Sequence, residues 1–282
     1  MYPYRLCTLY SGSTGNAAYL ETPHARILID AGKCAKTLTA SLASIGVTPD
    51  SLDAILVTHD HHDHVASLEV LAKKHPIPVH MLLQSAMIYK RNPPEALCAC
   101  LKLYNDPRFA VTIGDVAVNA FPTPHDSRAS VGFRFTLPDG TRIGYATDIG
   151  HVSKDVHDNL LGCESVVLES NHDVEMLFAG PYPYDLKLRI RSPHGHLSNR
   201  DCADFASELA AAGTKHILLA HLSEQNNYPD LAYDETASAI AGTGADLRVA
   251  SPVDVTMLVG EAASPIPKTP LPMPDAREVT AP

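Results

Sequence analysis

Short apolar runs separated by turn residues recur along the chain and predict a protein rich in strands. Each run holds four to seven residues, which suits a buried strand better than a helix of ordinary length. Strands are expected at residues 5–10, 17–21, 26–29, 54–57, 78–82, 109–113, 116–121, 131–137, 142–146, 165–168, 215–220, 247–250 and 255–259. Because the runs between 109 and 146 follow one another without a helix, the pattern argues against a doubly wound parallel sheet. It favours strand-rich halves with helices outside them.

Apolar residues at helical spacing predict helices between many of these strands. The expected helices cover residues 37–45, 65–75, 153–160, 184–191, 199–212 and 230–241. Ser198 could cap the helix 199–212, and Gly213 would end it. Residues 84–108 combine prolines, two cysteines and mixed charge. They are expected to form either a lid or a peripheral helix.

Length and composition fit one main domain with a short tail. We expect a domain over residues 1–260 and a Pro-rich, disordered tail over 261–282. No apolar run approaches the length of a membrane span, and the N-terminal residues show no signal-peptide pattern. Six scattered cysteines favour a reducing, cytoplasmic compartment. A net charge of −10 argues against a generic nucleic-acid coat but not against a nuclease, since bound cations would offset acidic ligands.

Residues 54–57 form an apolar run that leads directly into Thr58-His59-Asp60-His61-His62-Asp63-His64. His59 and His61 are two positions apart, so in an extended segment their side chains point the same way. Imidazole and carboxylate together suit zinc, manganese or iron. A solvated loop that is merely rich in histidine is the alternative, and the buried strand before the cluster argues against it.

Other strands end in the same residue types. Asp30, His125, Asp148 and His221 each follow an apolar run, and Glu169 ends one. A shared rim of a sheet sandwich would bring these residues together. Seven candidate ligands would then suit two metal ions, with Asp148 as the bridge: His59, His61, Asp63, His64, His125, Asp148 and His221. Scattered structural histidines and acids are the alternative.

Residues 58–64 resemble the His-x-His-x-Asp-His signature of the metallo-β-lactamase fold hydrolases. Asp30, His125, Asp148 and His221 match the remaining motifs in the right order, over roughly residues 6–259. The resemblance implies an α+β fold, a four-layer αββα sandwich with a dinuclear site at one edge of the two sheets. It also implies two divalent ions (Zn²⁺ or Mn²⁺, or iron), a hydroxide that bridges them, and a supporting role for Asp30. As an alternative, Asp30 would be a turn aspartate that satisfies backbone donors.

Four further segments, 11–16, 169–177, 195–199 and 221–227, resemble the YycJ/WalJ-type branch, whose members are regarded as exonucleases or phosphodiesterases. Glu169 and His196 also resemble the acid and histidine beside the metals of tRNA 3′-processing and β-CASP nucleases. The implied role of His196 is to protonate the leaving oxygen, with Glu169 orienting its ring. An unrelated acid and histidine are the alternative. Only 20 residues separate Asp148 from Glu169, so a β-CASP insert is absent.

These features predict a metal-dependent phosphodiesterase or nuclease, exonuclease-like, with a nucleic acid or another phosphodiester as substrate. Asp63 would be catalytic as well as a ligand, and Asp126 and His172 could line the site. Two other functions stay open: a hydrolase of thioesters, lactones or cyclic nucleotides, and a non-catalytic, metal-bearing signalling partner. A homo-oligomer is compatible with the sequence, and no membrane association is expected.

Two segments carry weaker hints of substrate contact. The turn at 11–16 could offer backbone donors to a phosphate, as glycine-rich nests do, or could be a tight hairpin. A second set could contact a phosphate backbone or merely form a solvated helix face: Tyr182, Tyr184, Lys187 and Arg189.

Overall fold

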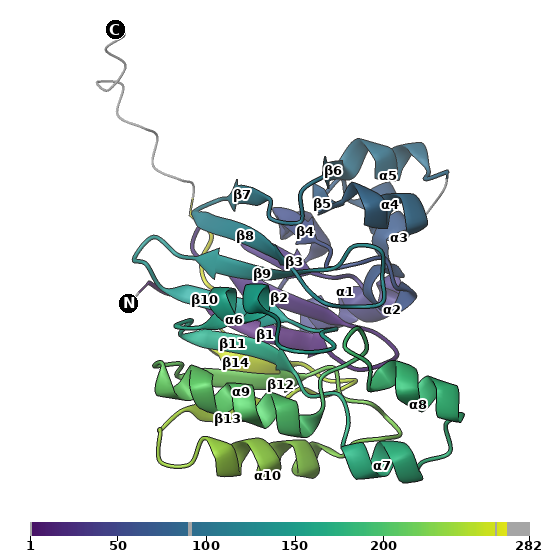
Figure 1. Cartoon of the computed structure of the whole chain (residues 1–282). Coiled ribbons are helices and arrows are strands. Elements are labelled where there is room, and N and C mark those ends of the chain that lie inside the picture. Colours follow the sequence, from purple (N-terminus) through teal and green to yellow (C-terminus); the bar gives the residue numbers. More distant parts are fainter. Residues whose placement is uncertain (1, 90–91, 263, 270–282) are drawn as a thin grey trace, which may run out of the picture.

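Two seven-stranded sheets face each other in the computed structural model, which describes residues 2–89, 92–262 and 264–269 (Figure 1). The first sheet has the order β14 (Thr256–Val259), β1 (Arg5–Tyr10), β2 (Ala17–Glu21), β3 (Arg26–Ile29), β4 (Ala54–Leu56), β5 (Val79–Leu82) and β6 (Leu101–Tyr104). The second has the order β13 (Asp246–Val249), β12 (His216–Ala220), β11 (Ser165–Glu169), β10 (Arg142–Ala146), β9 (Val131–Thr136), β8 (Val116–Pro122) and β7 (Ala110–Ile113).

Each sheet is half antiparallel and half parallel. In the first sheet β14, β1, β2 and β3 pair antiparallel, whereas β3, β4, β5 and β6 pair parallel. In the second sheet β7 to β10 pair antiparallel, and β10 to β13 pair parallel. The parallel strands require helical connections, so helices follow them on the outer faces.

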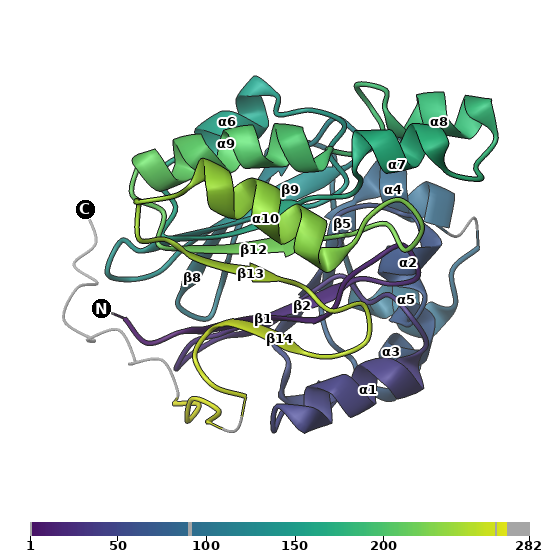
Figure 2. The same cartoon turned by 90° about the horizontal axis from the view of Figure 1, so that it is seen from below.

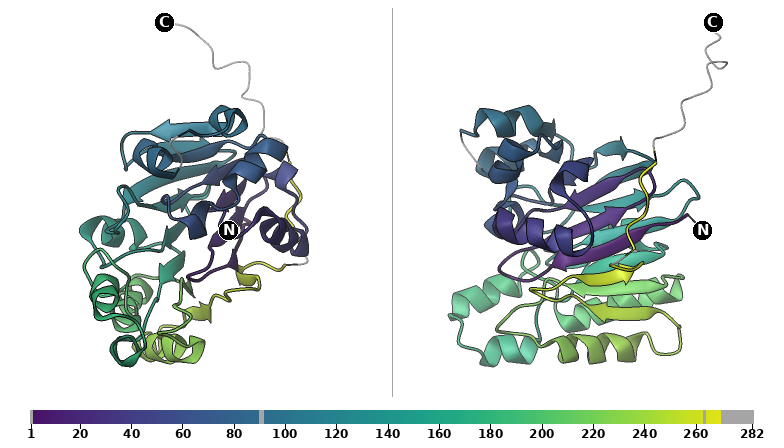
Figure 3. Two further views of the ribbon diagram at one scale, coloured as in Figure 1. Left: turned by 90° about the vertical axis from the view of Figure 1, so that its right-hand side faces the viewer. Right: turned by 180° about the vertical axis from the view of Figure 1, so that it is seen from behind.

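Helices cover the outer face of each sheet, which completes the four expected layers (Figure 2). The first half supplies α1 (Ala35–Ser44), the short 3₁₀ turn η1 (Pro49–Ser51), α2 (His62–Val65), α3 (Leu68–Lys74), α4 (Leu83–Tyr89) and α5 (Glu95–Cys100). The second half supplies α6 (Lys154–Leu160), α7 (Val174–Ala179), α8 (Tyr184–Ile190), α9 (Asn199–Ala211) and α10 (Pro229–Ala239). Figure 3 shows the blue and the green helices on opposite sides of the strands. The predicted αββα sandwich is confirmed.

Three apolar clusters correspond to the three interfaces between the four layers. The central cluster, with Phe133 and Phe135, lies between the sheets. A second packs the first sheet against α1, α3 and α5, and a third packs the second sheet against α6, α9 and α10. Strands such as β2 are therefore buried on both faces, which explains why they read as continuous apolar runs rather than as alternating ones.

The predicted helix 65–75 is wrong as a single element. The chain forms α2 and α3 with a break at Ala66 and Ser67. The backbone N–H of Ser67 donates to the carbonyl of Ala31 at 2.9 Å, and its hydroxyl donates to the carbonyl of Lys33 at 2.8 Å. These bonds hold α2 as a separate turn beside the site, a tertiary effect that apolar spacing does not reveal.

The stretch expected to form either a lid or a peripheral helix is regular. Residues 84–108 contain most of α4, all of α5 and the edge strand β6, which pairs parallel with β5. Helix α7 is absent from the predicted helices. Its N-terminus is capped by the Asp173 carboxylate, which accepts from the N–H of Met176 at 2.7 Å.

The described part of the expected tail lies against the first sheet. Ile266 donates its N–H to Glu21 at 3.3 Å, Lys268 pairs with Asp53 at 2.6 Å, and the N–H of Thr269 donates to Pro23 at 2.8 Å. Residue 263 and residues 270–282, the rest of the expected tail, lie outside the described residues, and the boundary at 260 stays a prediction. Among the described residues, no helix has the length and hydrophobicity needed to span a bilayer.

Candidate metal centre

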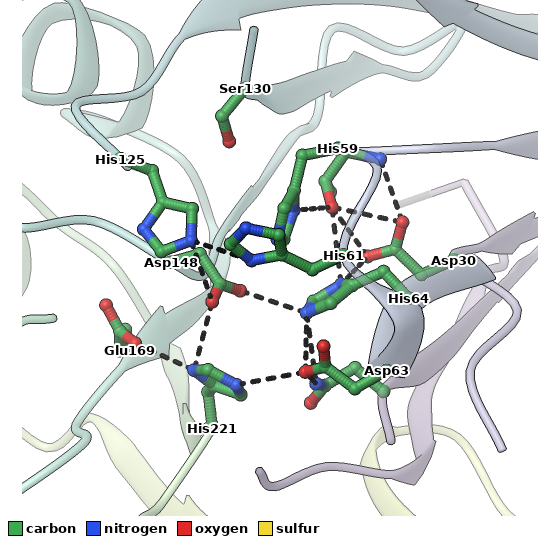
Figure 4. Close-up of polar contacts among 12 residues, drawn as sticks. Asp30, His59, His61, Asp63, His64, His125, Ser130, Asp148, Glu169 and His221 are labelled. Atoms are coloured by element: carbon green, nitrogen blue, oxygen red, sulfur yellow. Dashed lines mark hydrogen bonds and ion pairs between the residues drawn. The ribbon is translucent and has the colours of Figure 1, made fainter. Parts of the chain in front are cut away.

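Strand ends deliver the candidate ligands to one edge of the sandwich (Figure 4). His59 and His61 follow β4, Asp63 and His64 lie in α2, His125 lies between β8 and β9, Asp148 follows β10, and His221 follows β12. The structure brings all seven together. Their donor atoms form overlapping clusters within 4.8 Å of one another.

The backbone turns sharply at three of these strand ends. Asp30, Asp148 and His221 have φ angles of 60°, 57° and 57°, in the left-handed region that side chains other than glycine rarely adopt. Such a conformation costs on the order of 1–3 kcal/mol and persists where surrounding contacts hold it. The N–H of His221, for example, donates to the Ser11 hydroxyl at 2.9 Å.

His59, His61 and His125 form the first donor group. Nδ1 of His61 lies 3.3 Å from Nε2 of His125, whose Nδ1 donates to the carbonyl of Gly195 at 3.2 Å. Nε2 of His59 is buried and has no hydrogen-bond partner among the described residues. Burial lowers the pKa of His59 and of His125, and neighbouring histidines add to the shift. The imidazoles of His59 and His125 are therefore neutral, and each keeps a lone pair that can bind a metal ion.

Asp63, His64 and His221 form the second donor group. Nε2 of His64 lies 3.2 Å from Oδ2 of Asp63. Nε2 of His221 lies 3.7 Å from the same oxygen and has no hydrogen-bond partner within the described part of the chain. Both rings use Nδ1 for a carboxylate outside the group, so that Nε2 is turned toward the centre.

Asp148 lies between the two donor groups. Its Oδ2 is 3.3 Å from Nε2 of His64, and its Oδ1 is 3.7 Å from Nε2 of His125. Burial alone would lower the pKa of His64 and of His221. The surrounding carboxylates, of which Asp148 has the largest effect, outweigh burial, so the pKa of both residues is raised, and the pKa of His221 reaches about 10. The site thus favours positive charge. Its imidazole and carboxylate donors, and the unpaired nitrogens above, fit divalent metal ions.

Asp30 makes the contacts that each of its two expected roles requires. Its Oδ1 accepts the backbone N–H of Thr58 at 2.8 Å, as a turn aspartate would. Its Oδ2 accepts Nδ1–H of His64 at 2.8 Å, which orients that ring toward the centre.

Glu169 and His196 meet beside the donor groups. Oε1 of Glu169 accepts Nδ1–H of His196 and Nδ1–H of His221, both at 2.8 Å. Its Oε2 accepts the N–H groups of Ile149 and Leu197 at 2.7 and 3.1 Å. Burial opposes ionisation, but the two histidines outweigh it and lower the pKa of Glu169 to about 2. The contact with His221, which the sequence did not suggest, links the pair to a candidate ligand.

Asn16 is a site residue that the sequence reasoning missed. Its Nδ2 lies 3.2 Å from Oδ2 of Asp63 and 3.1 Å from Nε2 of His64, and its backbone N–H donates to the carbonyl of Asp63 at 2.8 Å. Its Oδ1 accepts from the Ser11 hydroxyl and the Gly12 N–H, both at 3.0 Å. The turn 11–16 therefore braces the second donor group, in addition to connecting β1 and β2.

A cleft of about 250 Å³ opens over the centre. Asp63, Asp148, His196 and His221 line it, and Asp126 does so as expected, paired with Arg189 of α8. The expectation for His172 is wrong. This residue is fully buried and is not among the residues that line the cleft, and neither ring nitrogen has a hydrogen-bond partner among the described residues.

The four residues proposed for phosphate contact lie in α8 and in the loop before it, and two of them line the cleft. Tyr182 and Arg189 line the cleft, whereas Tyr184 is largely exposed and does not. Lys187 is buried, and its ammonium donates to the carbonyls of Phe178 and Gly180, both at 2.7 Å. It stabilises the α7–α8 connection and is not available to a substrate.

The αββα sandwich, with imidazole and carboxylate donors gathered at one edge, defines a metal-dependent hydrolase of the metallo-β-lactamase fold. Residues 25–222 match the family model described as "Beta-lactamase superfamily domain". The chain is 35% identical over 252 residues to Exodeoxyribonuclease WalJ of Streptococcus pneumoniae, covering 87% of this chain and 93% of that protein. It is 37% identical over 228 residues to Exodeoxyribonuclease YycJ of Bacillus anthracis, covering 79% and 84%.

The fold comparison agrees with the sequence comparison. The metallo-β-lactamase fold protein YhfI from Bacillus subtilis superposes with a TM-score of 0.69 at 18% identity, over 90% of this chain and 99% of that one. The chain belongs to the β-lactamase superfamily, in the branch that contains WalJ and YycJ.

Proposed function

We propose that this protein is a dinuclear metal-dependent phosphodiesterase that degrades DNA as an exonuclease. The observation that carries the proposal is the Glu169–His196 pair, which lies against the donor groups and lines the cleft through His196. The names of WalJ and YycJ, two exodeoxyribonucleases similar over most of the chain, support the DNA substrate.

The two donor groups would each hold one metal ion, with Asp148 shared between them. Two such ions, when bound, activate water for attack on phosphorus and neutralise charge on the phosphate oxygens. Zinc and manganese both suit this mixture of nitrogen and oxygen donors, and iron is a third candidate. Asp63, whose carboxylate is partly exposed to the cleft, would accept a hydrogen bond from the attacking water. His64 and His221 keep it ionised, since they outweigh burial and hold its pKa far below the usual range.

His196 would protonate the departing oxygen. Its Nδ1–H is engaged by Glu169, so Nε2 is the nitrogen that can act on a substrate in the cleft. Burial lowers the pKa of His196, but Glu169 outweighs it and the net shift is upward, which favours the protonated acid. A sugar alkoxide needs this proton, whereas a thiolate leaving group does not.

The leaving group provides the test. Purified protein with Mn²⁺ is assayed on bis-p-nitrophenyl phosphate and on single-stranded DNA labelled at either end. We expect both to be hydrolysed, with His196→Ala slowing DNA hydrolysis about 10²–10⁴-fold. The effect on bis-p-nitrophenyl phosphate should be much smaller, because nitrophenolate leaves without a proton. The control is His157→Ala, which removes a half-buried histidine of α6 that pairs with Glu208.

Metal analysis separates the roles. His196→Ala should keep the metal content of the wild type, and loss of metal would make His196 a ligand instead. Inactivity on both phosphodiesters alongside turnover of S-lactoylglutathione, a lactone or a cyclic nucleotide would favour a small-molecule hydrolase. A His61→Ala variant that kept its cellular role without metal would favour a non-catalytic partner.

Two further expectations accompany this proposal. The cytoplasm is the expected compartment, since all six cysteines are free and a reducing environment keeps them so. The oligomeric state is open to light scattering on the purified chain.

A further inference from the structure

A second hollow, of about 410 Å³, borders the metal centre through His125. The loop between β8 and β9 separates it from the cleft: Asp126 lines the cleft, whereas Ser127 and Arg128 line the hollow. His125, a member of the first donor group, also lines the hollow, as does Gln84 of α4. In Figure 1, α4 and α8 lie toward opposite ends of the edge that carries the site.

The two cavities differ in charge. Three carboxylates line the cleft, Asp63, Asp126 and Asp148, and its Arg189 is already paired with Asp126. None of the described residues that line the hollow is acidic. An anion in the hollow would therefore face no carboxylate of its lining.

Polar groups in the hollow lack partners. Arg128 is exposed and makes no hydrogen bond or ion pair within the described ranges, whereas Arg108, Arg189 and Arg191 each pair with an aspartate. The hydroxyl of Ser127 is buried without a hydrogen-bond partner in the described part of the chain. A guanidinium presents a planar fork of donors that matches phosphate oxygens, so an unpaired arginine beside an unpaired hydroxyl suits a phosphate group.

We propose that this hollow is a second nucleic-acid subsite, which holds the nucleotide next to the scissile phosphodiester of a single strand, with Arg128 bound to its phosphate. The inference rests on the proposed function. A strand whose scissile phosphate lies at the metal centre must send the adjoining nucleotide across one wall of the site. The His125 side leads to the hollow, where a cation compensates for the carboxylates of the cleft and for a chain of net charge −10.

The test compares Arg128→Ala with Arg248→Ala, which removes an exposed arginine of β13 at the far edge of the second sheet. With Mn²⁺, Arg128→Ala should raise KM for a single-stranded oligonucleotide about tenfold, and Arg128→Lys should restore part of the loss. Hydrolysis of bis-p-nitrophenyl phosphate, which has no neighbouring phosphate, should stay unchanged in both variants. An equal loss on both substrates, or a KM no different from that of Arg248→Ala, would overturn the proposal.

A binding assay without turnover keeps this proposal separable from the proposed function. Fluorescence anisotropy of a labelled oligothymidylate in EDTA should show weaker binding by Arg128→Ala than by Arg248→Ala. The slope of log Kd against log salt should fall by about one. Wild type that binds the oligonucleotide but hydrolyses no phosphodiester would refute the function and leave the subsite supported. Equal binding and equal salt slopes in the two variants would refute the subsite.

Discussion

Glu169→Gln is the substitution that tests the arrangement of the site most directly. One carboxylate oxygen accepts from two imidazoles, those of His196 and His221, and the other accepts from two backbone N–H groups. An amide has only one acceptor oxygen, so glutamine can satisfy one pair at most. If that oxygen continues to accept from the two backbone N–H groups, the amide NH₂ group faces two imidazole N–H groups, and donors then face donors. His221 must then lose its partner or move its proton to Nε2, the nitrogen turned toward the second donor group.

The expected magnitude follows from those contacts. Loss of an outer partner of a ligating histidine lowers metal affinity or activity about 10–100-fold, or about 1.4–2.7 kcal/mol. Because His196 loses its orientation at the same time, we expect kcat/KM on DNA to fall at least about 100-fold, together with about tenfold weaker metal binding.

Metal affinity is measured by calorimetric titration of the metal-free protein, and the rate on end-labelled DNA at saturating Mn²⁺. Glu164→Gln is the matched control, because Glu164 immediately precedes β11 but pairs at 2.8 Å with the exposed Lys215. Thermal melts of both variants check that each is folded. Metal affinity and rates of Glu169→Gln within about twofold of Glu164→Gln would refute the reasoning.

Three other substitutions test separate parts of the structure. Asn16→Ala should weaken metal binding about tenfold, so that one ion is lost on dialysis. Elemental analysis measures this loss, and a variant that keeps both ions would contradict the bracing role. Gly32→Ala places a Cβ 1.9 Å from the carbonyl oxygen of Asp63, which must then move, so the metal content should fall sharply. Gly12→Ala, whose Cβ would lie 3.5 Å from the nearest atom, should keep the metal content of the wild type. Burial lowers the pKa of His172 to about 4 in the folded protein. Below about pH 6.5 the unfolded chain therefore binds a proton that the folded protein does not, so the free energy of unfolding decreases as the pH is lowered. Urea unfolding of the metal-free protein should show that His172→Leu removes about 2 kcal/mol of the loss between pH 7 and pH 5, and an unchanged loss would refute it.

Local pattern was sufficient to predict most of the strands and the gathering of the candidate ligands at one edge of the sandwich. The four-residue run 54–57 ends in the histidine cluster, and Asp148 and His221 each follow a short apolar run. Strand ends in a sandwich meet at its edges, so residue type and position together predicted which side chains would gather. Within this pattern the break between α2 and α3 was invisible, because it depends on hydrogen bonds from Ser67 to a loop more than thirty residues earlier.

The spacing of residues in the sequence could not show which groups each side chain contacts in the folded protein. Lys187 and Arg189 lie two positions apart in one helix, yet one is saturated by carbonyls and the other lines the cleft. His172 follows Glu169 by three residues, yet it is buried without lining the cleft. Helical and loop positions this close differ only in the direction in which the folded chain turns each side chain.

The sequence by itself determined the donor chemistry of this protein, since the types and the order of the candidate ligands are given by the residues at the ends of its apolar runs. The tertiary structure decided which nitrogen of His64 and of His221 faces the centre, because Asp30 and Glu169, which are distant from them in the chain, engage Nδ1. It also decided that Asn16 braces the second donor group and that Arg128 stands unpaired in a hollow beside the metal centre. Hydrogen bonds and charges act over a few ångströms, and only folding brings residues that are dozens of positions apart within that range.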